Sequence, residues 1–244
     1  MHDVKHSCEL AEYRLNGRTV HVEIYRPRST PVAPAILYLH EIYGVIDAYR
    51  EDAEELASRG YRVFLPNLYS GGMARKYCVR AAVTSAGRLN AAISPLYKEI
   101  AELLRIMRAE PSCDGTLGMI GMCLTGGFVI QAAMREGVEA PVIYHHSLGL
   151  QGAGVPSDEE PELAKIQRMQ GHWSRVDPFC PAPRRERLKR LLGDRLDDFV
   201  YNIPHGFRSL ARKTDASALA WRRTLAFFDQ NLGSNAHRST ATES

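Results

Sequence analysis

Hydrophobic and polar positions alternate along this chain with a period that changes repeatedly between two residues, as in a strand, and 3.6 residues, as in a helix. Two alternating stretches, at residues 8–14 and 19–26, flank the turn-forming pair Asn16-Gly17 and predict an antiparallel β-hairpin. A dense apolar run at residues 35–40 then predicts a strand that is buried on both faces.

The remaining segments continue this alternation. Further strands are predicted at residues 61–65, 116–122, 141–146, 166–172 and 199–203, and helices at 47–58, 95–109, 124–136, around Leu188 and at 216–232. About eight strands with helices between the later ones predict an α/β fold, a mostly parallel, doubly wound sheet opened by the antiparallel hairpin. We expect residues 1–233 to form a single domain and the small, polar residues 234–244 to form a disordered tail. Residues 69–89 are poorly periodic and receive no prediction.

Composition and charge narrow the classes of function. The 244 residues are 45% hydrophobic and carry a formal net charge of only +3, with the basic residues scattered, so nucleic acid is not an expected partner. The longest apolar run, at residues 32–39, is far shorter than the roughly 18 residues of a membrane span. Together with the lack of a recognisable signal sequence at the N-terminus, this favours a cytoplasmic protein that acts without a membrane.

The cysteines and histidines argue against disulfides and metals. Five cysteines are an odd number, widely spaced, with no C-x-x-C pair and no grouping at zinc-ligand spacing, as expected for free thiols in a reducing cytoplasm. His40-Glu41 begins like a zinc-protease helix motif, but position 44, where the second histidine would stand, is a glycine. We therefore expect no metal and no other cofactor.

The sharpest local signal is the segment Gly121-Met122-Cys123-Leu124-Thr125-Gly126-Gly127, where a predicted strand ends and a predicted helix begins. A nucleophile on such a tight turn requires small neighbours, which let the strand and the helix approach each other. The N–H groups and dipole at the start of the helix would lower the pKa of the Cys123 thiol and stabilise an oxyanion. We expect a thiolate nucleophile here; the alternatives are a small buried hydrophobe or a turn that binds a phosphate.

A cysteine nucleophile needs a base and an orienting carboxylate. Asp177 and His205 each follow a predicted strand, and the chain order Cys123, Asp177, His205 is that in which an α/β-hydrolase sheet supplies its triad. Alone, Asp177 could be a turn former and His205 a surface or capping residue. His145 and His146 are adjacent on one predicted strand and point to opposite faces, so at most one of them can reach a site.

Glu41 ends the buried strand at residues 35–40 and begins the loop Glu41-Ile42-Tyr43-Gly44, which in this architecture faces the nucleophile turn. A carboxylate at that depth is costly without a partner. It is either part of the site or a loop residue paired with an arginine.

These motifs resemble the dienelactone hydrolase family of α/β-hydrolases over nearly the whole chain. The resemblance rests on the segments Ile36-Leu37-Tyr38-Leu39-His40-Glu41-Ile42-Tyr43-Gly44 and Gly60-Tyr61-Arg62-Val63-Phe64-Leu65-Pro66-Asn67-Leu68-Tyr69, the cysteine turn, and His205-Gly206-Phe207. It implies an α/β-hydrolase fold and a Cys123-His205-Asp177 triad, with an oxyanion hole from the N–H groups of Leu124 and Ile42. It also implies that Glu41 accepts the thiol proton when substrate arrives.

The chain departs from the family pattern in two places. The family turn is usually G-x-C-x-G-G, whereas here Thr125 precedes the glycine pair, and the two family positions for a carboxylate-anchoring arginine hold Gly71 and Ser209. Arg75, Arg80, Arg208 or Arg212 could substitute, or could be ordinary surface charges. The candidate substrate-binding residues are Tyr43, Arg75, Arg80, His146, Phe207 and Arg208.

The sequence thus predicts a cysteine-dependent hydrolase of a small ester or lactone, a monomer or small homo-oligomer whose partner is the small-molecule substrate. The alternatives are a hydrolase of thioesters or other acyl compounds on the same triad, and a non-catalytic module that binds a small anion.

Overall fold

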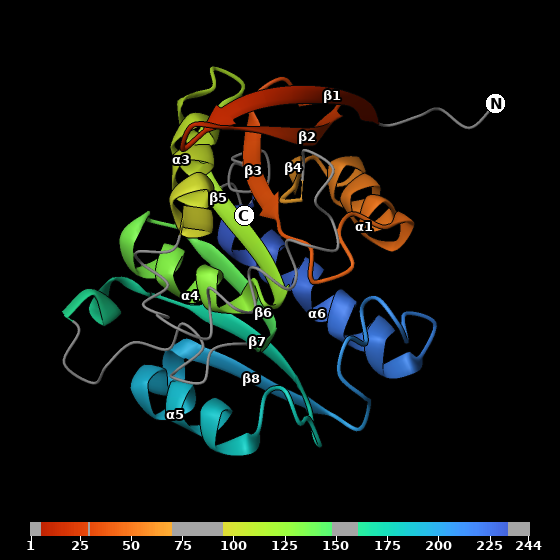
Figure 1. The fold of residues 1–244 in the computed structure, drawn as a ribbon, viewed down its shortest axis with the longest axis vertical. Coiled ribbons are helices and arrows are strands. Elements are labelled where there is room, and N and C mark those ends of the chain that lie inside the picture. The colour runs from red at the N-terminus through yellow and green to blue at the C-terminus, as the bar shows by residue number, and fades with distance from the viewer. Residues whose placement is uncertain (1–5, 29, 70–94, 148–160, 234–244) are drawn as a thin grey trace, which may run out of the picture.

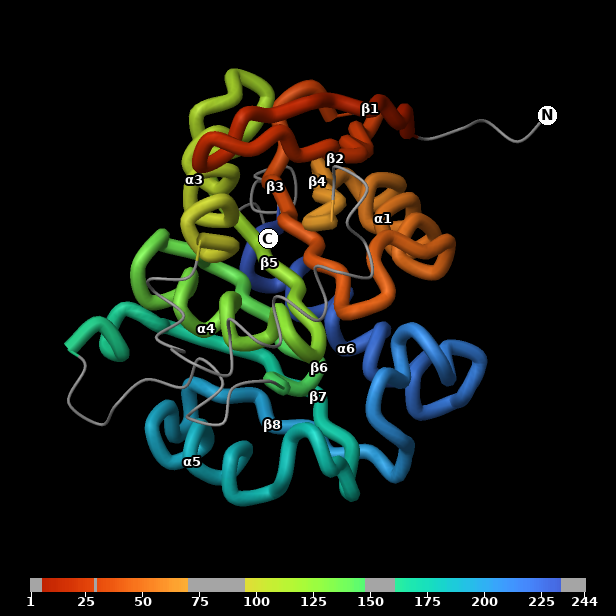
Figure 2. Tube along the Cα trace, viewed as in Figure 1, coloured from red at the N-terminus to blue at the C-terminus, as the bar shows by residue number. Residues whose placement is uncertain are grey.

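A single eight-stranded sheet forms the centre of the molecule, which we describe from a computed structural model for residues 6–28, 30–69, 95–147 and 161–233. The strands lie in the order β1-β2-β4-β3-β5-β6-β7-β8. Their bounds are β1 His6–Leu15, β2 Arg18–Pro27, β3 Ala33–Tyr38, β4 Arg62–Asn67, β5 Cys113–Cys123, β6 Ala140–His146, β7 Met169–Ser174 and β8 Leu196–Tyr201. Figure 2 shows the chain passing from the red hairpin at one end of this sheet to β7 and β8 at the other.

The pairing confirms the predicted doubly wound α/β sheet. β1 and β2 form an antiparallel hairpin, and β2 is also antiparallel to β4. The six strands β4, β3, β5, β6, β7 and β8, in their order across the sheet, pair in parallel. The hairpin turns at Asn16 and Gly17, both with positive φ (45° and 78°), a conformation that this residue pair adopts at little steric cost.

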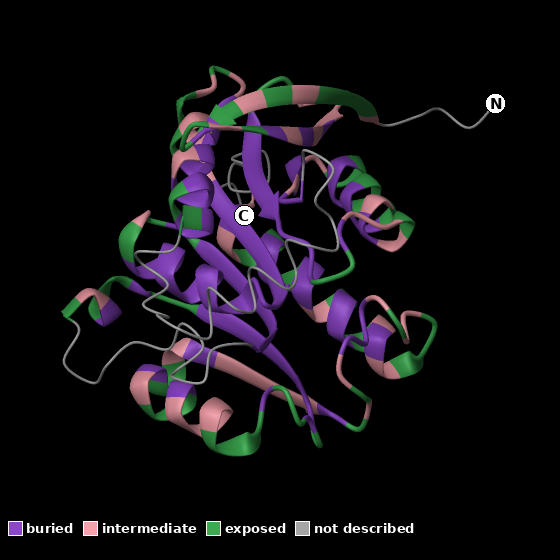
Figure 3. Cartoon of the chain, in the orientation of Figure 1, coloured by how far each residue is buried: buried purple, intermediate pink, exposed green. Residues whose placement is uncertain are grey.

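Among the described residues, five helices cover the two faces of the sheet. They are α1 Asp47–Ser58, α3 Pro95–Ala109, α4 Gly126–Arg135, α5 Ala182–Leu192 and α6 Asp215–Leu232, together with the short 3₁₀ helices η2 Pro161–Lys165 and η3 Gly193–Arg195. The apolar side chains of α3, α4 and α5 belong to one hydrophobic core and those of α1 and α6 to another, so the helices divide three to two between the faces. The central strands are buried, and exposed residues gather on β1 and the outer helix surfaces (Figure 3).

Most element boundaries agree with the sequence pattern, and the exceptions follow from strand pairing. β7 begins at Met169 rather than Ile166, because Met169 pairs with Leu196 at the start of β8. For the same reason β8 begins at Leu196 and ends at Tyr201, three residues earlier at its start and two earlier at its end than predicted. The predicted tail, residues 234–244, and the unassigned segment at 70–89 lie outside the described residues. Among the helices described, none combines the length and the hydrophobicity that crossing a bilayer requires.

Candidate active site

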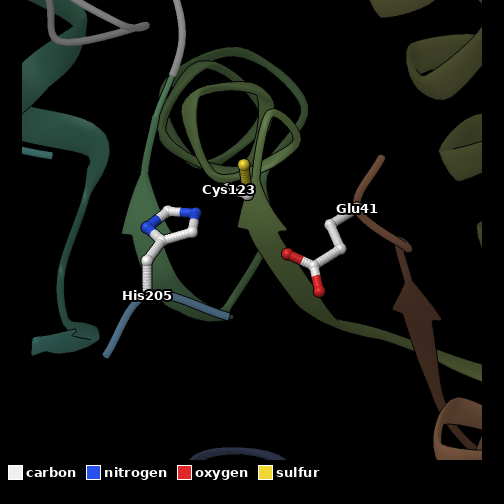
Figure 4. Close-up of side chains that lie close together, drawn as sticks. All are labelled: Glu41, Cys123 and His205. Carbon is white, nitrogen blue, oxygen red and sulfur yellow. The ribbon is translucent and has the colours of Figure 1, made fainter. Parts of the chain in front are cut away.

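Four of the singled-out side chains stand at the carboxyl ends of parallel strands, the edge where α/β sheets bind ligands. Cys123 is the last residue of β5, Glu41 follows β3, Asp177 follows β7, and His205 follows β8. In Figure 4 the Cys123 sulfur lies between the His205 imidazole on one side and the Glu41 carboxylate on the other. Ligand-type atoms of these three side chains all lie within 4.8 Å of one another.

Asp177 fixes the His205 ring. His205 Nδ1 lies 2.7 Å from Asp177 Oδ2, while Asp177 Oδ1 accepts the backbone N–H groups of Phe179 (2.9 Å) and Cys180 (3.0 Å). Burial alone would raise the pKa of Asp177, but the hydrogen bond and charge of His205 and the backbone donors outweigh it and hold that pKa below its usual value. An ionised carboxylate bonded to Nδ1 leaves Nε2 of His205 available, and within the described residues this nitrogen has no hydrogen-bond partner.

The cysteine turn is tight, as its small residues predicted. Cys123 has a φ of +52°, which is rare for a residue with a side chain and is typical of a nucleophile on a strained strand-to-helix turn. A Cβ at Gly121 would lie 2.6 Å from the Thr125 carbonyl oxygen, and one at Gly126 would lie 2.5 Å from the His145 carbonyl oxygen. Only glycine therefore lets β5, α4 and β6 come this close.

Thr125, the departure from the family pattern, is built into this turn. Its Oγ1 accepts the Met122 N–H at 2.9 Å and donates to the Met122 carbonyl oxygen at 3.0 Å. The extra residue delays the helix, which begins at Gly126 rather than at Leu124 as predicted. The hydroxyl thus closes the turn that the additional residue lengthens.

The predicted thiolate is wrong for the resting site. Burial, followed by the nearby Glu41 charge, raises the pKa of the Cys123 thiol to about 12, although the neighbouring Leu124 N–H and Ser147 hydroxyl dipoles oppose the shift. Cys123 is only 7% exposed, so the loss of hydration outweighs the helix start. The thiol is therefore protonated at neutral pH.

Among the described residues, the partner of the Glu41 carboxylate is a tyrosine. Its side chain is 2% exposed, and Oε1 accepts the Tyr49 hydroxyl of α1 at 2.8 Å. Burial and the neighbouring Glu41 charge raise the pKa of Tyr49, so Tyr49 is a neutral hydrogen-bond donor. The tyrosine offsets part of the cost of burying the carboxylate.

His40 anchors the loop that carries Glu41. Its Nε2 accepts the Leu68 N–H at 3.0 Å, so Nδ1 carries the proton and donates to the Glu41 carbonyl oxygen at 2.7 Å. Burial lowers the pKa of His40 to about 4, which keeps this ring neutral. The end of β3 is thus bonded, through His40, to the residue that follows β4.

Comparison with known proteins agrees with this geometry. The sequence profile of the dienelactone hydrolase family matches residues 20–232. The chain belongs to the dienelactone hydrolase family. It is 28% identical over 229 residues to a carboxymethylenebutenolidase of Pseudomonas putida, covering 87% of this chain and 92% of the relative, and 25% identical over 224 residues to one of Rhodococcus opacus, covering 86% of each.

Solved structures show the same fold. A dienelactone hydrolase-like promiscuous phosphotriesterase from metagenomic libraries superposes with a TM-score of 0.70 at 18% identity, covering 94% of this chain and 100% of that one. As a member of the dienelactone hydrolase family, this chain is a hydrolase of ester or lactone bonds with the α/β-hydrolase fold.

Of the four arginines predicted as possible anchors for a substrate carboxylate, the two that the structure describes are paired with a carboxylate of α1. Arg75 and Arg80 lie outside the described residues. The predicted substrate-binding role of Arg208 is corrected, because its guanidinium is engaged inside the protein. Arg208 is 3% exposed, ion-paired with Asp52, and stacked 4.6 Å from the centre of the Trp221 ring. Arg212 also pairs with Asp52, so both guanidinium groups neutralise a carboxylate of α1.

Two other substrate-binding candidates are buried, and their substrate roles stay predictions. Phe207 is fully buried and packs edge-on against His145, with ring centres 5.3 Å apart. His146 is buried too, and its Nδ1 lies 3.9 Å from the Cys180 sulfur. Tyr43 is half exposed in the loop after Glu41, and its substrate role stays a prediction, as does the oxyanion role of the Ile42 N–H.

Sequence reasoning missed His145 and Tyr49. The alternation on β6 indicated that one of the two adjacent histidines could reach the site, and it is His145, stacked on His205, rather than His146. Tyr49 gave no signal beyond an apolar position of the α1 helix. The clusters Glu41-Cys123-His205 and His145-Asp177-His205 have donor atoms that a soft metal ion could bind, so the absence of a metal cofactor stays a prediction.

Replacing Gly126 by alanine tests the tight turn. The new Cβ would lie 2.5 Å from the His145 carbonyl oxygen and 3.0 Å from the His146 Cα, so the start of α4 must shift. We expect a loss of about 1–3 kcal/mol in the free energy of unfolding, measured with urea. We also expect the rate of ester hydrolysis to decrease by more than the fraction of unfolded protein accounts for. Gly17→Ala, where the Cβ meets no atom within 4 Å, is the control for strain in a turn far from the site. Wild-type stability and activity in Gly126→Ala would contradict the close approach.

Proposed function

We propose that this enzyme hydrolyses small carboxylic esters or lactones with a Cys123-His205-Asp177 triad and a thioester intermediate. The observation that carries the proposal is the cluster at the carboxyl edge of the sheet. There the Cys123 sulfur, one nitrogen of His205 and one oxygen of Glu41 lie within 4.8 Å of one another, and His205 is bonded to Asp177 at 2.7 Å. A nucleophile, a base and an orienting carboxylate are the parts that acyl transfer requires.

The reaction begins with a neutral thiol. When substrate enters, Cys123 gives its proton to Glu41, the thiolate attacks the carbonyl carbon, and the carbonyl electron pair moves onto oxygen. The Leu124 N–H, which lowers the thiol pKa in the resting site, and the Ile42 N–H then donate to this oxyanion. Glu41 can act as this base because its carboxylate lies within 4.8 Å of the Cys123 sulfur and is an acceptor for the thiol proton.

The intermediate then collapses and the enzyme is regenerated. The leaving oxygen takes a proton, which reaches it from Glu41 through His205, and a thioester to Cys123 remains. His205 next removes a proton from water, and the hydroxide attacks the thioester. The bond between the Cys123 sulfur and the acyl carbon then breaks, His205 returns its proton to the sulfur, and the acid leaves a neutral thiol behind. Asp177 stabilises the imidazolium that forms at each transfer.

A substrate panel with mass spectrometry tests this function. Wild-type protein, kept with EDTA to exclude adventitious metal, is incubated with p-nitrophenyl esters, lactones, dienelactones and thioesters. Turnover of oxygen esters and an acyl mass on the Cys123 peptide after rapid quenching support the proposal. Turnover of thioesters alone would favour the other acyl hydrolase, and no turnover with retained anion binding would favour a binding module.

Glu41→Gln separates thiol control from catalysis. Removing the Glu41 charge lowers the thiol pKa below about 12, so alkylation of Cys123 by iodoacetamide at pH 9 should become several-fold faster while ester turnover falls. Alkylation is followed by intact mass and turnover by product absorbance. Glu54→Gln, at an exposed position of α1, is the matched control and should change neither. Slower alkylation in Glu41→Gln would contradict this role.

We further propose that the enzyme works in the cytoplasm, as a monomer or small homo-oligomer. A cysteine nucleophile needs a reduced thiol, and Cys8, Cys113, Cys123 and Cys180 are all free. Cell fractionation and light scattering test the two statements separately.

A further inference from the structure

His145 is a second imidazole at the proposed triad. It lies near the end of β6 with a φ of +43°, one of three non-glycine residues with positive φ in the described part of the chain. The other two are Asn16 of the hairpin and Cys123 itself. Non-glycine residues in this conformation carry strain that the surrounding structure must offset, and they gather at functional sites.

The contacts of His145 lead to His205 and Asp177. Its ring stacks on the His205 ring with centres 4.1 Å apart and planes inclined by 26°. Its Nε2 accepts the Gly206 N–H at 3.2 Å, so the proton of the neutral ring is on Nδ1. This Nδ1 has no hydrogen-bond partner among the described residues and lies 3.7 Å from Asp177 Oδ2, the oxygen that His205 also uses.

We propose that His145 is a positioning residue, which holds the His205 ring by stacking and shares the Asp177 carboxylate with it. The inference rests on the proposed function of the triad. His145 is 1% exposed and Phe207 packs against its edge, so it does not face substrate. Its bond to the Gly206 N–H also fixes the backbone directly after His205.

His145 stays neutral while His205 cycles its charge. Burial, followed by the charge of His205, lowers the pKa of His145 to about 3, and Asp177 only partly opposes this. The titratable groups that face it are His205 after β8, Asp177 after β7, His146 on its own strand and His172 on β7. His145 therefore does not accept the proton from His205. Its Nδ1–H dipole is attracted to the same Asp177 oxygen whether His205 is neutral or charged.

Two substitutions separate the parts of this role. His145→Phe keeps a flat ring against His205 but removes the dipole toward Asp177, whereas His145→Asn keeps an N–H donor near the Nδ1 position. With Oδ2 of Asp177 left to His205 alone, the imidazolium of His205 is stabilised more strongly. In His145→Phe we expect the acid limb of kcat/KM to move upward by about half a pH unit. We also expect kcat to fall on the order of tenfold with KM little changed.

An NMR titration of the His205 imidazole in histidine-labelled protein measures the effect of His145 on His205 without any substrate turnover. The His205 titration midpoint should move upward in His145→Phe and return toward wild type in His145→Asn. His172→Gln is the matched control: His172 is equally buried but stacks on Tyr144 and bonds Tyr201, so it should lower stability without moving the midpoint.

The outcomes distinguish the two proposals. An unchanged midpoint and acid limb in folded His145→Phe would overturn the positioning role, whatever the enzyme hydrolyses. A wild-type protein that turns over no ester while the midpoint still shifts would overturn the proposed function and leave the coupling between His145 and His205 standing.

Discussion

Ester hydrolysis is expected to fall by on the order of 10⁴-fold or more when Cys123 is replaced by alanine. The variant loses the atom that forms the thioester, whereas Asp177, His205 and the turn backbone keep their places, so only water-mediated hydrolysis remains. The rate is measured with the best ester of the panel under single-turnover conditions. The alanine fits the turn because it requires no more space than the cysteine it replaces.

Cys113→Ala is the matched control for this experiment. Cys113 begins β5, the strand that Cys123 ends, and is likewise a buried free thiol. The Cys113→Ala variant should keep wild-type turnover. Its free energy of unfolding should decrease only by the small contribution of one buried thiol. Equal turnover in Cys123→Ala and the wild type would remove residue 123 from the chemistry and with it the triad.

Replacing Asp52 by alanine should cause the largest loss of stability, about 3–5 kcal/mol in the free energy of unfolding. Asp52 is fully buried, accepts the Tyr38 hydroxyl at 2.7 Å, and pairs with Arg208 and Arg212. Without it, the guanidinium of Arg208 stays 3% exposed with an uncompensated charge, although its remaining bonds to Ser217 persist. Urea unfolding followed by tryptophan fluorescence measures the loss.

A double variant tests whether that loss comes from the stranded charge. Asp52→Leu with Arg208→Met removes both charges together and should lose clearly less stability than Asp52→Ala alone. Arg212→Ala, whose side chain is 25% exposed, should cost less still because water can replace its contact. A loss below about 1 kcal/mol in Asp52→Ala would contradict the importance of this network.

The order of the site residues along the chain was predictable, because each follows a strand with a recognisable apolar run. Parallel strands bring their carboxyl ends to one edge, so Glu41, Cys123, Asp177 and His205 could be placed together without coordinates. The protonation state of the Cys123 thiol could not be predicted from the sequence, because it depends on how deeply the sulfur is buried and how close Glu41 lies to it. Neither the depth nor the distance is visible in the local sequence.

The roles of the other polar residues depend on contacts between distant parts of the chain. Arg208 was assigned to the substrate because it lies three residues after His205, but its partner Asp52 comes from α1, 156 residues earlier. His145 received no predicted role because strand alternation does not say which of two neighbouring histidines faces the site. Its positive φ could not be predicted from the sequence either.

The buried, neutral sulfur of Cys123 also bears on survival of the enzyme under oxidative stress. Peroxides react with thiolates and hardly with thiols, and access limits the reaction further. A cysteine ionised only when substrate fills the site spends little time in the form that becomes sulfenic acid. We therefore expect the resting enzyme to lose activity to hydrogen peroxide more slowly than an enzyme whose cysteine is ionised without substrate.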